Sequence, residues 1–200
     1  FEEVMYPAFL SQLLGYAPGI SFYIELITPE VLSEALEQRQ VDMVVGLDSQ
    51  SSLPNGVVQT PWMHEELVCL AAQHNPHVGD ALALEAFARQ LHVELADISG
   101  LLPSRIENCL AEHGLTRRVI SKNLNYIAAA RVVALTDAII TLPRQMAERF
   151  VAMLPVRMVA PPDELPELTM TLIQHTLYAN APANVWLYQE LTAFAKNASR

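Results

Sequence analysis

The chain has 200 residues, 52% of them hydrophobic, which is enough for one large domain or two small lobes with a substantial core. Twelve Lys and Arg residues against 22 Asp and Glu residues give a net charge of −10, and so acidic a surface repels phosphate backbones, which makes the chain by itself a poor nucleic-acid binder. Cys69 and Cys109 are too few for a disulfide framework, so we expect two buried thiols in a reducing compartment, and no apolar stretch is long enough for a membrane span.

The first part of the chain reads as helix, strand, helix and strand. Pro7 opens a helix that ends in the breaker cluster 15–19. Residues 20–27 are rich in β-branched and aromatic side chains, which predicts a strand. Thr28, followed by Pro and Glu, predicts a helix start with Thr28 as the N-cap. The apolar run 41–47 is typical of a strand in the middle of a parallel sheet.

Helices and strands continue to alternate in the rest of the chain. The expected helices span 82–91, 104–113, 143–150 and 182–194, and a further helix is capped by Asn123. The expected strands span 66–72, 92–95, 119–121, 137–141 and 168–176, and the expected loops include 48–61, 73–80, 96–103 and 155–166. Strands that alternate with helices predict an α/β fold with mostly parallel sheets.

One local pattern occurs twice. Thr28 and Asp42 are fourteen residues apart, and so are Asn123 and Asp137. Each pair follows an extended apolar run, encloses an amphipathic helix and ends where an apolar strand begins. The repeat predicts two similar α/β lobes, and a cleft between lobes is a common place for a small ligand.

The two long extended runs, 66–72 and 168–176, look like crossover strands that pass between the lobes and act as a hinge. We therefore expect lobe I to comprise residues 1–69 and 174–200 and lobe II to comprise residues 70–173. The closing helix would then pack on lobe I.

No catalytic constellation is visible in the sequence. It contains no Gly-rich phosphate loop, no GxSxG motif and no HExxH motif. His74 and His77 lie close together, but no further ligand has suitable spacing, so a solvated loop is favoured over a metal site. Ser104 is better explained by a helix start than by a nucleophile, and Cys69 has neither a base nor a positive charge beside it. We expect no enzyme activity, no metal and no cofactor.

A ligand site has better support. Thr28 and Asn123 each follow a strand and precede a helix, and ligands of open α/β sheets gather at the carboxyl ends of strands near helix N-termini. Thr141 ends a strand of the second lobe, and Ser99 and Gly100 form a small polar loop that offers backbone N–H groups. The alternative is that Thr28 and Asn123 only cap their helices.

The order of several motifs resembles the effector-binding domain of LysR-type transcriptional regulators, of the NodD/NahR-like branch. Residues 6–10 and 16–20 resemble the family's first helix and its "YPGV" turn, and residues 32–46 resemble its "L…L..g.lDlaig" signature. Residues 136–144 are similar to its late "diiatlPr" strand and turn, and residues 180–187 resemble its "dp…WLr" closing helix. The likeness covers nearly the whole chain.

The resemblance implies a two-lobed fold of the type II periplasmic-binding-protein kind and a role in transcription regulation. A small molecule would bind between the lobes and change how an attached DNA-binding module engages its operator. The family's winged helix-turn-helix domain is absent from this chain, and so is the first sheet strand, which would precede Phe1. Related domains form a homodimer or tetramer in which residues 7–14 and 20–27 of one copy meet residues 104–113 and 119–121 of another. A cytoplasmic location without membrane contact is implied, and DNA would be bound only through the missing domain.

Two other classes of protein share this fold. A periplasmic solute-binding protein of a transporter would differ in the residues before Phe1, where a signal peptide or lipobox would replace the helix-turn-helix. An enzyme on the same fold is less favoured because no nucleophile–base pair is visible. The sequence leaves open the identity of the effector, its activating or repressing effect, and the target genes.

Overall fold

The computed structural model describes residues 2–28, 30–47, 53–95 and 101–198, which form two compact units. Unit 1 consists of residues 1–64 and 169–200, and unit 2 of residues 65–168. The chain therefore passes from unit 1 into unit 2 within strand β2 (Val57–Glu65) and returns within strand β8 (Leu168–His175). In the described part of the chain, no helix is long and apolar enough to cross a membrane.

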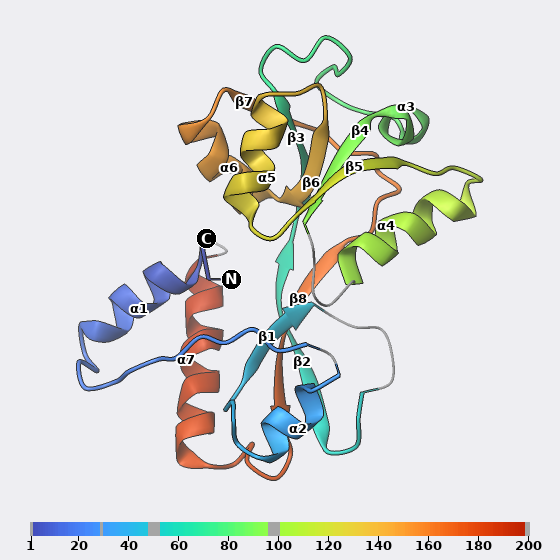
Figure 1. The fold of residues 1–200 in the computed structure, drawn as a ribbon. Coiled ribbons are helices and arrows are strands. Elements are labelled where there is room, and N and C mark those ends of the chain that lie inside the picture. Colours follow the sequence, from blue (N-terminus) through green and yellow to red (C-terminus); the bar gives the residue numbers. More distant parts are fainter. Residues whose placement is uncertain (1, 29, 48–52, 96–100, 199–200) are drawn as a thin grey trace. The chain divides into compact units, whose positions relative to one another are not determined.

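Unit 1 is a three-stranded sheet between two layers of helix (Figure 1). The strand order is β1 (Val44–Leu47), β8, β2, and β1 runs antiparallel to β8. Helices α1 (Tyr6–Leu14) and α7 (Pro182–Ala198) cover one face, where Phe9 and Phe194 meet edge to face with ring centroids 5.5 Å apart. Helix α2 (Leu32–Glu37) packs on the other face.

Unit 2 is built on a five-stranded sheet in the order β5-β4-β6-β3-β7 (Figure 1). Its strands are β3 (Leu67–Ala72), β4 (Leu91–Leu95), β5 (Arg118–Asn123), β6 (Ile139–Pro143) and β7 (Val156–Val159). Its helices are α3 (Leu84–Arg89), α4 (Leu101–Glu112), α5 (Tyr126–Ala134) and α6 (Arg144–Met153). Phe87 of α3 and Leu110 of α4 are buried in the core of one face. Helices α5 and α6 pack against the strands from the other face.

The α/β class is confirmed, but the expected majority of parallel pairs is wrong. Strand β4 is parallel to β5 and β6, whereas β1–β8, β3–β6 and β3–β7 are antiparallel. Strand β1 also lies at the end of its three-stranded sheet and not in the middle of a parallel one. Helix–strand alternation produces parallel neighbours, but β3 follows β2 directly and β8 follows a long irregular segment, so neither obeys that rule.

Residues 20–27 do not form the expected strand. The segment runs as a long extended connection between α1 and α2 (Figure 1), but it belongs to neither sheet. Tyr23 and Leu26 are consequently exposed, at 89% and 74%, whereas Phe22 packs edge to face against Phe9 of α1. Side-chain composition favours extended backbone here, but a strand also needs a hydrogen-bonded neighbour.

Two loops were expected to be longer than they are. Strand β2 begins at Val57, inside the loop expected at 48–61, and β7 lies inside the proline-rich segment expected to be irregular. The helices that begin near Pro7, Pro143 and Pro182 are confirmed. Proline marks a first turn reliably because its fixed φ suits a helix start and its missing N–H removes no intrahelical bond there.

Candidate functional site

The carboxyl edge of the parallel strands in unit 2 is the candidate site. Because β4 is parallel to both β5 and β6, these strands end at the same edge of the sheet, at Leu95, Asn123 and Pro143. Helices α5 and α6 begin directly after β5 and β6, so their N-termini lie at this edge too (Figure 1). Free backbone N–H groups and the positive ends of helix dipoles favour polar ligand groups at such an edge.

Asn123 lies at this edge, but it does not cap the following helix. It is the last residue of β5, and its side-chain Nδ2 donates to Ser121 Oγ at 3.1 Å. The N-cap is Asn125, whose Oδ1 accepts a hydrogen bond from the backbone N–H of Ala128 at 2.8 Å. The expected cap was therefore two residues early. Both asparagines are good caps by composition, and the strand continues through the first of them.

Thr141 lies near the same edge and contacts a buried thiol. Its Oγ1 is 3.8 Å from Cys69 Sγ, the register partner on β3. Burial raises the pKa of the Cys69 thiol to about 12, so the thiol stays protonated and the contact is between neutral groups. Cys69 is therefore a core residue, as expected.

Asn123 and Thr141 belong to opposite faces of the sheet. Thr141 shares the face of Cys69, which carries α3 and α4. Glu94 and Lys122 are paired on that same face, and side chains alternate along a strand, so Asn123 faces the α5 side. A ligand touches both side chains only where it lies over the edge of the sheet itself.

The positive side chains around this edge are paired with carboxylates. Arg144, the first residue of α6, donates through Nε and Nη2 to the two carboxylate oxygens of Glu66, both at 2.6 Å, which lowers the pKa of Glu66. Lys122 Nζ lies 2.9 Å from Glu94 Oε1. Sequence reasoning missed both pairs, because the partners come from different elements and no spacing in the chain links them.

Thr28 lies in unit 1 and does not cap α2. The N-cap of that helix is Val31, which makes no side-chain capping bond. The Thr28 hydroxyl hydrogen-bonds the carboxylate of Glu30 and lowers its pKa, and the Thr28 carbonyl accepts from the backbone N–H of Val31 at 3.2 Å. Thr28 is thus used to shape the turn before the helix. Ser99 and Gly100 lie outside the described residues.

A polar cluster crosses the sheet of unit 1 beside the carboxyl end of β1. Gln59 Nε2 donates to Thr171 Oγ1 at 2.8 Å and to the Leu47 carbonyl at 3.3 Å, and Thr171 donates to the Gly46 carbonyl at 3.1 Å. Thr171 is buried. The sequence patterns did not single out these residues, because isolated Gln and Thr side chains on strands carry no motif.

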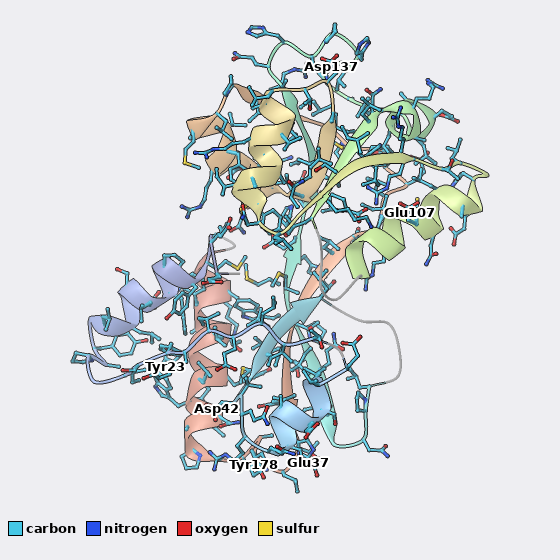
Figure 2. The ribbon with its side chains drawn as sticks, in the orientation of Figure 1. Tyr23, Glu37, Asp42, Glu107, Asp137 and Tyr178 are labelled. Atoms are coloured by element: carbon cyan, nitrogen blue, oxygen red, sulfur yellow. The ribbon has the colours of Figure 1, made fainter. Side chains whose placement is uncertain are left out.

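Metal-binding clusters are absent from the described residues, where no group of three or more His, Cys, Asp and Glu side chains gathers. His77 Nε2 lies 3.9 Å from Asp137 Oδ2, and both side chains are mostly exposed. Asp137 precedes β6, so this pair lies at the end of the strand opposite to the candidate site (Figure 2). Asn75, two residues before His77, is buried and donates through Nδ2 to the Asp137 carbonyl at 2.9 Å, which gives that loop a structural role.

The sequence matches the family model described as "LysR substrate binding domain" over residues 1–196. It is 29% identical over 198 residues to the HTH-type transcriptional regulator SyrM of Rhizobium meliloti (strain 1021), covering 98% of this chain and 59% of the relative. It is 32% identical over 189 residues to Nodulation protein D 3 of Rhizobium leguminosarum bv. phaseoli, covering 92% of this chain and 60% of the relative. The chain thus spans about 60% of the length of these curated relatives.

Solved structures share the fold. The regulatory domain of MexT, a transcriptional activator in Pseudomonas aeruginosa, superposes with a TM-score of 0.82 at 21% identity, covering 96% of this chain and 92% of that one. The effector binding domain of QuiR in complex with shikimate gives a TM-score of 0.76 at 17% identity, covering 96% and 90%. The expected type II periplasmic-binding-protein-like fold is therefore confirmed.

Proposed function

Because the chain belongs to the family of LysR substrate binding domains, we propose that it binds a small-molecule effector and thereby controls a transcription regulator of which it is the sensing part. The relative SyrM is named as a transcriptional regulator and not as an enzyme, which also disfavours a transporter's solute-binding protein. The QuiR domain, which shares the fold, holds shikimate. Control of transcription belongs to the longer protein, and DNA binding falls to a domain outside this acidic chain, in the cytoplasm.

The observation that carries the proposal is the convergence of β5, β6 and two helix N-termini at one edge of unit 2. Asn123 and Thr141 stand at that edge with polar atoms that a ligand can reach, since both side chains are only half buried. Thr28, Ser99 and Gly100 are further proposed contacts, supported by the sequence pattern alone.

The first experiment replaces the polar atoms at the edge. Native mass spectrometry of the purified chain identifies a co-purified small molecule, and calorimetry then measures its affinity for Asn123→Leu and Thr141→Val. We expect each variant to weaken binding by roughly five- to twentyfold, because one hydrogen bond contributes ~1–2 kcal/mol. Asn180→Leu, at an exposed turn of unit 1, is the matched control. Unchanged affinity in both edge variants rejects the site.

We also propose that the chain pairs with a second copy of itself. The segment 20–27 is extended, lacks a sheet partner and exposes Tyr23 and Leu26. Strand β5 is the end strand of its sheet and exposes Ile120. Tyr23 is labelled on the extended segment between α1 and α2 in Figure 2. Unpaired backbone beside apolar side chains is suited to protein–protein contact. Sedimentation equilibrium tests this self-association by comparing Leu26→Asp with Leu177→Asp, a control at a similarly exposed position.

A further inference from the structure

Leu124 is an apolar side chain standing alone at the polar edge of unit 2. It exposes 91% of its surface, the largest fraction among the large hydrophobic side chains that the structure describes. It follows Asn123, the last residue of β5, and precedes Asn125, the N-cap of α5. It therefore lies where three parallel strands end and two helices begin.

The backbone around Leu124 is held on both sides. Asn123 is fixed by its bond to Ser121 Oγ at 3.1 Å and by its register with Leu95 on β4. Asn125 is fixed by its capping bond to the Ala128 N–H at 2.8 Å. A side chain between two anchored residues has a defined direction, so its exposure is a feature of the fold and not of a loose loop.

A single exposed leucine is common on protein surfaces, so position decides whether it has a role. Leu135 shows the ordinary case. It lies at the C-terminal end of the same helix, α5, and is 85% exposed. It is therefore about as exposed as Leu124 but lies a full helix length from the carboxyl edge of the strands.

We propose that Leu124 is a specificity-determining contact that packs against an apolar part of the effector, an inference that rests on the proposed ligand site at this edge. Burial of apolar surface favours binding in proportion to the area covered. The nearby charges also favour an uncharged effector, because Arg144 and Lys122 are each already paired with a carboxylate. The class of effector that fits is a molecule with an uncharged ring or branched apolar face and hydroxyl or carbonyl groups for Asn123 and Thr141.

The test uses two uncharged six-membered rings that differ in apolar surface. Cyclohexanol has an apolar ring face, whereas myo-inositol carries a hydroxyl on every ring carbon. NMR titration of the chain, with labelled backbone amides and leucine methyl groups, reads Asn123, Leu124, Leu135 and Thr141 separately. Cyclohexanol is expected to shift the Leu124 methyl signals together with the Asn123 amide, and myo-inositol is expected to leave Leu124 in place.

Variants then measure how much Leu124 contributes. Leu124→Ser is expected to raise the cyclohexanol dissociation constant about fivefold, and Leu124→Met, which restores apolar area, to return it close to the original value. Leu135→Ser, at an equally exposed site, is expected to leave it unchanged.

Each contrary result has a distinct meaning. Shifts at Asn123 and Thr141 without a shift at Leu124 overturn the role of Leu124 and leave the ligand site standing. Equal shifts at Leu124 and Leu135 show general adhesion to exposed leucines, which also overturns the inference. If neither compound shifts the signals of Asn123, Leu124 or Thr141, the result counts against the ligand site itself. A Leu124 signal that moves with protein concentration and not with cyclohexanol assigns the side chain to contact between copies of the chain.

Discussion

His92 is fully buried and makes only half of its hydrogen bonds. Its Nε2 lies 2.8 Å from the Phe87 carbonyl, so this nitrogen carries the proton, and Nδ1 has no partner within the part of the chain that the structure describes. Phe87 also packs edge to face against the imidazole ring, with centroids 4.6 Å apart. Burial lowers the pKa of His92 to about 4, which keeps the ring neutral in the folded chain.

The lowered pKa of His92 predicts a loss of stability in acid. Between the ordinary pKa of 6.5 and the folded value of about 4, the unfolded chain binds the proton and the folded chain does not. The free energy of unfolding therefore decreases as the pH drops through this window, by about 2 kcal/mol from pH 7 to pH 5. Urea denaturation at several pH values checks this. His92→Gln should flatten the dependence, and an equally steep loss in that variant would show that other groups cause it.

Gly56 meets a second histidine at close range. Its φ is +80°, and a Cβ built there would lie 2.5 Å from Nε2 of the buried His175. Gly114 has a similar φ of +68°, but a Cβ there meets nothing within 4 Å. The two positions thus separate the cost of left-handed backbone from the cost of a clash.

Gly56→Ala is expected to lower the free energy of unfolding by about 3 kcal/mol, and Gly114→Ala by about 1 kcal/mol. The difference reflects the displacement of the His175 ring. Thermal unfolding followed by circular dichroism measures both variants. Equal losses in the two would mean that His175 moves aside at no cost.

Among the elements of unit 2, a partly buried ion-pair network joins a helix to two strands. Arg117 directly precedes β5. Its Nη2 lies 2.8 Å from Glu94 Oε2 on β4, and its Nε lies 2.8 Å from Oε1 of Glu107 on α4 (Glu107 is labelled in Figure 2). Glu94 also pairs with Lys122 on β5. The side chains of Arg117 and Glu94 are only 3% and 8% exposed, so each needs the other to offset its lost hydration.

Arg117→Leu is expected to destabilise unit 2 by about 3 kcal/mol, because Glu94 would keep only a partner on the surface. Arg118→Leu is the neighbouring control, since Arg118 is exposed, and it is expected to change stability by less than about 0.5 kcal/mol. Denaturant unfolding followed by fluorescence compares them. Similar small losses in both variants would mean that the network contributes little.

The elements also show why sequence patterns succeed or fail. Helices that begin near Pro7, Pro143 and Pro182 were predicted, because proline and amphipathic spacing act within one turn of chain. The strand at 20–27 was not formed, because a strand depends on a neighbour that its own residues do not specify. Asn125 was passed over as the cap because β5 continues two residues beyond the end of its apolar run.

Across the whole molecule, the two pairs of residues spaced by fourteen correspond structurally only at their second members, the two Asp residues. Asp42 and Asp137 each precede a strand by two residues, β1 in unit 1 and β6 in unit 2. Thr28 and Asn123 do not correspond as caps, since α2 begins after Val31 and α5 after Asn125. The spacing indicated an α/β arrangement with a repeated helix–strand unit. It could not predict ion pairs such as Arg144–Glu66, because these depend on contacts between residues that are distant in the sequence.

We expect the effector to bind at the carboxyl edge of the parallel strands in unit 2. Hydrogen–deuterium exchange of the chain, with and without the co-purified small molecule, locates the ligand directly. We predict slower exchange in residues 121–128 and 139–146, which form that edge, and no change in the loop 73–80 at the opposite end of the sheet. Protection in that loop with unchanged exchange at 121–128 and 139–146 would contradict the proposed site.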